Sequence, residues 1–319
     1  MKINRIAKIC FVGGILVSIF LASRNKLKDL LFFEITKKES IRNFDLGAYY
    51  ATFKPFRNWE VEEPEIKADS AISVAIGPKG ENKVLFQKNS KKILPIASVT
   101  KLMTALIIFE NYDLSQKIVI SENIANTEGD INNFKAGEAF YTKDLLYPLL
   151  MESSNASGKA LSEIMGEENF VDLMNKRAKE LGLLNTHFLN STGLDPDNAK
   201  TLPNLSSAKD LVTLSSFLLG KSVIWEILKT KEFELYQVNG SFHHKVKNTN
   251  EFLELPVQNG WETKILGGKT GKTPLAKECF LLVLEGPRSN FLVNVILGSQ
   301  NRFEEMKTLI NWINIAYKW

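Results

Sequence analysis

The chain has 319 residues, which is long enough for one large catalytic domain or two small ones and excludes a peptide hormone or a disulfide miniprotein. Hydrophobic residues make up 44% and charged residues 24%, close to the averages of globular proteins, which argues against a disordered, collagenous or multispan membrane chain. The formal net charge of +4 at pH 7 is spread along the chain, so we do not expect nucleic acid as a partner.

The first 23 residues have the pattern of an export segment. Lys2, Arg5 and Lys8 precede an uncharged run from Ile9 to Ala22. As a helix this run would span roughly 21 Å, less than the roughly 30 Å of a bilayer's hydrocarbon core, which favours a signal peptide over a full span. The end of the run lacks a clear small-x-small cleavage site, which favours an uncleaved anchor. We therefore predict a signal anchor or signal peptide over residues 1–23.

Residues 24–65 are predicted to form a membrane-proximal tether, and residues 66–319 the catalytic domain. The tether ends in a stretch that places Pro64 among four glutamates. A packed N-terminal extension of the domain is the alternative, since aromatic residues such as Phe56 and Trp59 favour burial.

The main domain begins with the alternation of apolar and polar residues that is typical of a β-hairpin. Residues 71–76 and 83–87 are predicted strands on either side of a Gly-Pro-Lys-Gly turn. Two more strands are predicted near the C-terminus, over residues 280–284 and 291–297.

Between and after these strands, apolar residues recur at helical spacing. Helices are predicted over residues 97–110, 142–151, 156–165, 168–181, 208–219 and 302–317. Strands from both ends of the domain with helices between them predict an α+β fold. We expect one antiparallel sheet flanked by helices, with an inserted all-helical region.

Ser98 and Lys101 form a Ser-x-x-Lys motif at the start of a predicted helix, shortly after Pro95. Residues three apart share one face of the first turn, so the lysine amine could take the proton of the serine hydroxyl. A lysine does so only where burial or neighbouring cations lower its pKa. A serine helix cap beside a solvated lysine is the structural alternative.

Ser153 and Asn155 form a Ser-x-Asn motif after an apolar run. A hydroxyl and a carboxamide on one short loop can relay a proton to a leaving amine and hold a substrate amide. A capped turn between two helices is the alternative.

Lys269, Thr270 and Gly271 form a Lys-Thr-Gly motif that occurs once, and Lys272 and Thr273 follow it. On a strand edge, the ammonium and hydroxyl groups could bind a substrate carboxylate, and the glycine would allow another backbone to approach closely. A phosphate loop is the rival interpretation, but the spacing of its first glycine is wrong by one residue. A proline and a strand also follow where such a loop needs a helix.

In chain order, the three motifs are the set found in penicillin-binding proteins and class A β-lactamases. The chain resembles the low-molecular-mass penicillin-binding proteins, the serine-type D-Ala-D-Ala carboxypeptidases, over about residues 70–319. The resemblance also includes segments 83–86, 94–105, 127–129, 136–138, 144–147 and 190–194.

This resemblance implies a serine β-lactamase and DD-peptidase-like fold that performs acyl transfer in a cleft between the sheet and the helical region. Lys101 would act as general base on Ser98, which would attack the carbonyl of the penultimate D-Ala of a peptidoglycan stem peptide. Ser153 would pass a proton to the departing D-Ala. The backbone N–H groups of Ser98 and Lys272 would form the oxyanion hole. The implied substrate-binding residues are Asn155, Lys269, Thr270, Gly271, Lys272 and Thr273.

The implied partners are the stem peptide, β-lactam antibiotics as inhibitors, and the membrane through the N-terminal segment. The C-terminal β-rich domain and amphipathic anchor that are frequent in the family are not expected here. Attachment would then fall to the N-terminal segment, with the catalytic domain on the extracytoplasmic face of the bacterial cell membrane or secreted.

Three alternatives remain open: a D,D-endopeptidase, a β-lactamase, and an idle wall-binding scaffold. The Glu-x-x-Leu-Asn segment with which class A β-lactamases deacylate does not occur between Asn155 and Lys269, which favours slow release of penicillin. All three motifs are complete, which disfavours the idle scaffold. We expect no cofactor, and no metal site because His187, His243 and His244 lack the spacing of metal ligands.

Overall fold

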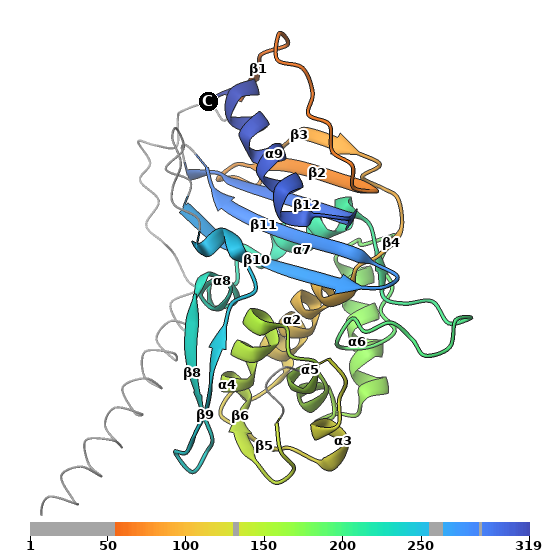
Figure 1. The fold of residues 1–319 in the computed structure, drawn as a ribbon, viewed down its shortest axis with the longest axis vertical. Helices are drawn as coiled ribbons and strands as arrows, with labels where there is room; N and C mark the ends of the chain where they lie inside the picture. Colours follow the sequence, from red (N-terminus) through yellow and green to blue (C-terminus); the bar gives the residue numbers. More distant parts are fainter. Residues whose placement is uncertain (1–54, 130–133, 255–263, 287–288) are drawn as a thin grey trace, which may run out of the picture. The chain divides into compact units, whose positions relative to one another are not determined.

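The computed structural model describes residues 55–129, 134–254, 264–286 and 289–319. Its centre is a five-stranded antiparallel sheet with the strand order β10-β11-β12-β2-β3 (Figure 1). The strands are β2 (Ser70–Ile76), β3 (Asn82–Lys88), β10 (Lys264–Thr273), β11 (Lys277–Glu285) and β12 (Phe291–Ser299). The predicted hairpin and both predicted C-terminal strands are confirmed, and they belong to the same sheet.

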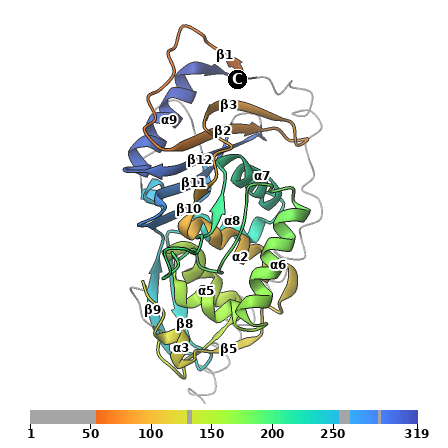
Figure 2. The same cartoon turned by 90° about the vertical axis from the view of Figure 1, so that its right-hand side faces the viewer.

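Helices cover both faces of this sheet (Figures 1 and 2). Helix α9 (Arg302–Ala316) packs on β11 and β12 from one side. From the other side, α7 (Ala208–Leu218) packs on β12 and β2, and α8 (Ser222–Lys229) packs on β10. Because helices cover both faces of the sheet, every residue of β2 is buried, and its sequence is mostly apolar on both faces.

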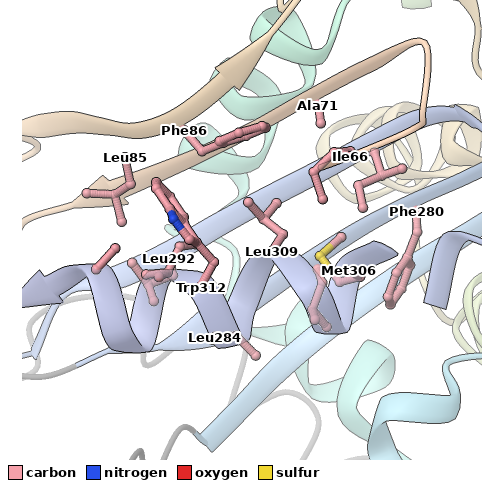
Figure 3. Packing of buried hydrophobic residues seen from close by; sticks show 14 of the residues in the cluster. Ile66, Ala71, Leu85, Phe86, Phe280, Leu284, Leu292, Met306, Leu309 and Trp312 are labelled. Carbon is pink, nitrogen blue, oxygen red and sulfur yellow. The ribbon is translucent and has the colours of Figure 1, made fainter. Parts of the chain in front are cut away.

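The core between the sheet and α9 is built from alternate strand residues, because successive side chains of a strand point to opposite faces. Figure 3 shows strand residues of this core facing the apolar side of α9. The residues include Phe86, Phe280, Leu284 and Leu292 of the sheet and Met306, Leu309 and Trp312 of the helix.

The region between β3 and β10 is mainly helical, and this confirms the predicted α+β class. Its helices are η2 (Ala97–Thr100), α2 (Lys101–Asn111), α3 (Glu122–Ala125), α4 (Thr142–Tyr147), η3 (Pro148–Glu152), α5 (Asn155–Ser162), α6 (Glu167–Glu180), α7, α8 and η4 (Glu251–Glu254). The insertion is not all-helical, however. It also contains the short antiparallel ladders β4–β7 (Leu94–Pro95 with Leu205–Ser206), β5–β6 (Lys117–Val119 with Ala139–Tyr141) and β8–β9 (Glu232–Tyr236 with Phe242–Lys247).

Residues 55–65 contact the domain at the end of α9. Strand β1 (Phe56–Arg57) pairs with β13 (Tyr317–Lys318), and the indole Nε1 of Trp312 donates a 2.6 Å hydrogen bond to the Glu62 carbonyl. The predicted signal segment and the predicted tether up to residue 54 lie outside the described residues, so the predicted domain boundaries stay predictions. Within the described residues, no single helix is long and apolar enough to cross a bilayer; α7 and α8 pass that test only together, as a pair bent by 109°.

Candidate active site

Ser98 and Lys101 lie on one tight turn that runs from η2 into α2. We expected a regular helix from residue 97, but the first turn is a 3₁₀ helix, in which side chains three residues apart eclipse each other. This stacking brings the Nζ of Lys101 to 2.9 Å from the Oγ of Ser98. The Lys101 side chain is fully buried, whereas Ser98 is half-buried.

Two further oxygen atoms contact the Lys101 amine. Its Nζ lies 2.7 Å from the Oδ1 of Asn155 and 2.6 Å from the backbone carbonyl of Thr192. The amide Nδ2 of Asn155 donates a 2.9 Å hydrogen bond to the Glu128 carbonyl, which fixes the orientation of the carboxamide. The first and second motifs, far apart in the sequence, are therefore joined directly.

The Ser-x-Asn motif lies where two helical segments meet. The π-helical turn η3 ends at Glu152, and the next residue, Ser153, has a left-handed backbone with φ 66°. Such π-helical turns are frequent at functional sites. The hydroxyl of Ser154 caps α5 by accepting a 3.0 Å hydrogen bond from the Ser157 N–H. The capped turn that was the alternative interpretation is therefore present, and it does not exclude the contact of Asn155 with Lys101. Ser153 lies near the site because it precedes Asn155 by two residues. Among the described contacts, no hydrogen bond joins its side chain to the other motifs.

The Lys-Thr-Gly motif lies on β10, the edge strand of the sheet. The Lys269 side chain is fully buried, and its Nζ donates a 3.0 Å hydrogen bond to the Thr270 carbonyl. The Thr270 hydroxyl lies 2.7 Å from the Thr249 hydroxyl. The Thr249 hydroxyl also donates a 3.1 Å hydrogen bond to the Met151 carbonyl. Thr249 thus links the third motif to the segment just before Ser153.

Gly271 allows β10 to lie directly against the turn that carries Ser98. A Cβ atom at position 271 would lie 3.0 Å from both the Ile96 carbonyl oxygen and the Ser98 amide nitrogen. These distances are tighter than ordinary van der Waals contact, so the close approach requires glycine. The predicted role of this residue in backbone approach has a geometric basis.

Lys272 and Thr273 engage acidic side chains. The Nζ of Lys272 forms a 3.0 Å ion pair with Glu278, and the Lys272 side chain is 69% exposed. The hydroxyl of Thr273 donates a 2.8 Å hydrogen bond to Asp195, which also accepts from the Leu275 N–H at 3.0 Å. The described contacts of these two side chains are therefore with acidic residues and not with Ser98.

Two basic side chains, Lys269 and Arg302, lie close enough at β10 to affect each other's charge. The pKa of Lys269 is held well below its ordinary value of 10.5. Burial is the main cause, and repulsion from Lys101 and Arg302 adds to it. Arg302 donates a 3.1 Å hydrogen bond to the Gly271 carbonyl, and burial lowers the pKa of its guanidinium too. These neighbouring cations favour a ligand that carries a carboxylate.

Thr249 and Arg302 contribute to this site although no sequence pattern indicated them, and so does Thr192, which the sequence placed in the resembling segment 190–194 without a role. Thr192 acts through its backbone carbonyl, which no side-chain pattern reveals. Arg302 starts the last helix, 31 positions away from Gly271, and carries no local motif.

Comparisons with known proteins agree with this geometry. A family model described as D-alanyl-D-alanine carboxypeptidase matches residues 57–301, a range that contains all three motifs. The D-alanyl-D-alanine carboxypeptidase DacF of Bacillus subtilis (strain 168) is 31% identical, over 85% of this chain and 69% of its own. The D-alanyl-D-alanine endopeptidase of Escherichia coli (strain K12) is 28% identical, over 79% of this chain and 78% of its own. Penicillin-binding protein D2 from Listeria monocytogenes, in its cefotaxime-bound form, is 25% identical with a TM-score of 0.66, over 79% of this chain and 99% of that one.

Proposed function

We propose that this chain, which belongs to the D-alanyl-D-alanine carboxypeptidase family of serine hydrolases, releases the terminal D-Ala of peptidoglycan stem peptides through an acyl-enzyme on Ser98. One observation carries the assignment of the nucleophile. The Nζ of Lys101 lies 2.9 Å from the Oγ of Ser98, within the reach of direct proton transfer. A serine hydroxyl needs such a neighbouring base to become a nucleophile.

In the acylation step, the Lys101 amine takes the proton of the Ser98 hydroxyl while Oγ attacks the carbonyl carbon of the penultimate D-Ala. The negative charge that develops on the carbonyl oxygen needs backbone N–H donors, for which we propose those of Ser98 and Lys272. The close approach of β10 to Ser98 at Gly271 supports this placement. The bond to the leaving nitrogen then breaks, and Ser153 passes the proton from Lys101 to the amine of the departing D-Ala.

In the deacylation step, water attacks the ester carbonyl of the acyl-enzyme and gives its proton to Lys101. The ester bond breaks, Ser98 recovers its hydroxyl hydrogen, and the shortened stem peptide leaves. Asn155 holds the Lys101 amine through both steps by its 2.7 Å contact.

The terminal carboxylate of the substrate would bind along β10 near Thr270. The positive charges of Lys269 and Arg302 support this placement, since a bound carboxylate would offset the repulsion between them. We assign Lys272 and Thr273 a weaker share of the binding, because their side chains engage Glu278 and Asp195.

We infer that the N-terminal segment holds the domain at the extracytoplasmic face of the cell membrane, where peptidoglycan lies. The basic residues before the uncharged run at residues 9–22 support an export segment. Fractionation of cells that produce the full chain tests this inference. Recovery of the protein in the cytoplasm would contradict it.

The proposed activity is tested with an acylated Lys-D-Ala-D-Ala tripeptide and a measurement of free D-Ala. The wild type releases D-Ala, whereas Ser98→Ala does not. Ser121→Ala is the matched control, since Ser121 caps α3 through Ile124 and its loss costs about 1 kcal/mol of stability without touching the site. Undiminished release of D-Ala by Ser98→Ala would overturn the proposal.

A D,D-endopeptidase is the second candidate, because the 28% identical relative from Escherichia coli carries that name. Both activities cleave beside a D-residue with the same nucleophile. A cross-linked muropeptide dimer, offered together with the tripeptide, separates them. Faster cleavage of the cross-link than release of D-Ala would assign the endopeptidase activity.

A further inference from the structure

We infer that Asn190 and Asn204 are positioning residues that aim the amine of Lys101 at Ser98 by holding the Thr192 carbonyl in place. The inference rests on the proposed role of Lys101 as general base. Neither asparagine belongs to the three motifs. Both act on the turn at residues 190–194, which we call the Asn190 turn.

The geometry around Lys101 shows why the Thr192 carbonyl matters. A neutral amine has two N–H hydrogens and one lone pair, and a base must direct that lone pair at the proton it removes. The Asn155 and Thr192 oxygens, at 2.7 and 2.6 Å, take the two hydrogens. An amine held in this orientation can direct its lone pair at the Ser98 hydroxyl, 2.9 Å away. If the Thr192 carbonyl moved, a hydrogen of the amine could turn toward Ser98 instead.

The Asn190 side chain fixes the turn that presents this carbonyl. Its Oδ1 accepts hydrogen bonds from the Thr192 N–H at 3.1 Å, the Thr192 hydroxyl at 3.2 Å and the Gly193 N–H at 2.7 Å. Its Nδ2 donates to the Leu194 carbonyl at 3.0 Å. Asparagine commonly stabilises turns in this way. One side chain therefore holds the peptide groups on both sides of Thr192.

Asn204 joins the Asn190 turn to the turn that carries the nucleophile. Its Nδ2 donates 2.9 Å hydrogen bonds to the Asn190 carbonyl and to the hydroxyl of Thr100, which lies between Ser98 and Lys101. Its Oδ1 accepts from the Leu189 and Asn190 N–H groups at 2.7 and 3.1 Å. Because Asn204 is only 1% exposed, it cannot reach a substrate and acts through these partners.

The two turns are also in direct contact, so a shift of one moves the other. Gly193 has φ +88°, and a Cβ atom there would lie 2.1 Å from the carbonyl oxygen of Ala97, the residue before Ser98. The hydroxyl of Thr104 donates a 2.6 Å hydrogen bond to the Ser191 carbonyl. The Asn190 turn is thus fastened to the nucleophile's helix on both sides of Thr192.

The test separates binding from chemistry in the reaction with benzylpenicillin, using the full chain and rapid quenching followed by intact mass. Asn190→Ala and Asn204→Ala are expected to slow the acylation step roughly 10- to 100-fold while the dissociation constant of the initial complex stays within about threefold. Asn175→Ala is the matched control. Asn175 makes two 2.8 Å hydrogen bonds with the backbone of Phe188, in the same segment of chain but without a bond to the Asn190 turn. It is expected to lower stability and leave acylation unchanged.

Asn190→Asp covers the case in which an alanine variant does not fold, since it keeps the size and the acceptor oxygen and removes the donor to the Leu194 carbonyl. We expect its acylation step to slow at least about tenfold. Acylation at the wild-type rate in folded Asn190→Asp and Asn204→Ala would overturn the inference. So would an equal slowing in Asn175→Ala. Ser98→Ala is measured alongside, because an adduct in that variant would instead overturn the proposed function.

Discussion

Lys101 and Lys269 are both fully buried, but their surroundings suit different tasks. The amine of Lys101 contacts oxygen atoms of Ser98, Asn155 and Thr192, which orient it. Lys269 hydrogen bonds to the Thr270 carbonyl and lies near the positive charge of Arg302. In the proposed mechanism, the first arrangement directs a lone pair and the second favours the binding of an anion.

Replacement of either member of the Ser98 and Lys101 pair should abolish turnover. We expect Ser98→Ala and Lys101→Ala each to lower kcat/KM by about 10⁴-fold or more, because nucleophile and base act as one unit. For the same reason the double variant should be no worse than the single ones. The measurement is release of D-Ala, with urea unfolding as a check of the fold. Near-normal turnover in Lys101→Ala would mean that another group is the base.

The buried Lys269 should lower stability, so Lys269→Met is expected to raise the free energy of unfolding at pH 7 by about 1 kcal/mol or more while activity is lost. Burial lowers the folded-state pKa well below 10.5, so the unfolded chain binds this proton more readily. The destabilisation is therefore complete below the folded-state pKa and disappears as the pH rises through about 10.4.

Urea unfolding of the wild type and Lys269→Met at pH 7 and pH 9.5 measures this effect. The difference between the two proteins should be smaller at the higher pH. A variant that is less stable than the wild type at pH 7 would contradict the account of Lys269.

The sequence predicted that Lys101 and Asn155 lie near Ser98 but not how they are held, and it did not predict that Lys272 and Thr273 engage acidic side chains instead. Lys101 and Asn155 were recognisable because their residue types and order carry chemistry. The Thr192 carbonyl was not, since every residue has a carbonyl and only the fold selects one. The hydrogen bond from Thr273 to Asp195 was also unpredictable, because the two residues lie 78 positions apart in the chain.

At the scale of elements, the close contact between the Asn190 turn and η2 can be tested with a pair of glycines. Gly193 and Gly137 both have φ +88°, so alanine at either position costs about 1–3 kcal/mol of backbone strain. A Cβ at Gly137 meets nothing within 4 Å, whereas one at Gly193 would overlap the Ala97 carbonyl oxygen at 2.1 Å. We expect both variants to lose stability.

Gly193→Ala should lose more stability than Gly137→Ala, and it alone should slow acylation by penicillin. Thermal unfolding and the acylation rate are the measurements. Equal acylation rates in the two folded variants would show that the contact between the turns does not position Ser98.

A helix or strand can be predicted when its own sequence shows the apolar pattern of that element. Strands β2 and β12 are buried and apolar, so their sequences predicted them. Strand β10 contains glycines and lysines, and its conformation depends on pairing with β11. The hairpin β8–β9 buries few side chains and therefore shows little periodicity. The 3₁₀ start of α2 and the π-helical η3 change hydrogen-bond spacing without changing the apolar pattern.

At the scale of the whole domain, a few polar contacts join the sheet to the inserted region around the site. Thr249 connects Thr270 of β10 with the Met151 carbonyl, and Asp195 connects the end of the Asn190 turn with Thr273. The part of α9 around Trp312, which bonds to the Glu62 carbonyl, takes no part in these contacts, so we expect it to be separable in function from the site.

This separation predicts different outcomes for two buried tryptophans. Trp312→Phe removes the indole bond to the Glu62 carbonyl and should cost about 1–3 kcal/mol of stability without changing acylation. Trp225→Phe removes a 2.7 Å bond to the Leu218 carbonyl beneath β10, where Trp225 packs against Gly267. It should both destabilise the protein and slow acylation. Denaturation and acylation rates check the pair, and slowed acylation in Trp312→Phe would contradict the separation.

The measurement that tests the central claim most directly is the intact mass of the protein over time after mixing with benzylpenicillin. We predict a covalent adduct on Ser98 that persists, since the chain lacks the Glu-x-x-Leu-Asn segment associated with rapid deacylation, and that is absent in Ser98→Ala. An adduct that appears and disappears while penicillin is consumed would instead indicate a β-lactamase. A folded wild-type protein that forms no adduct would contradict the catalytic account.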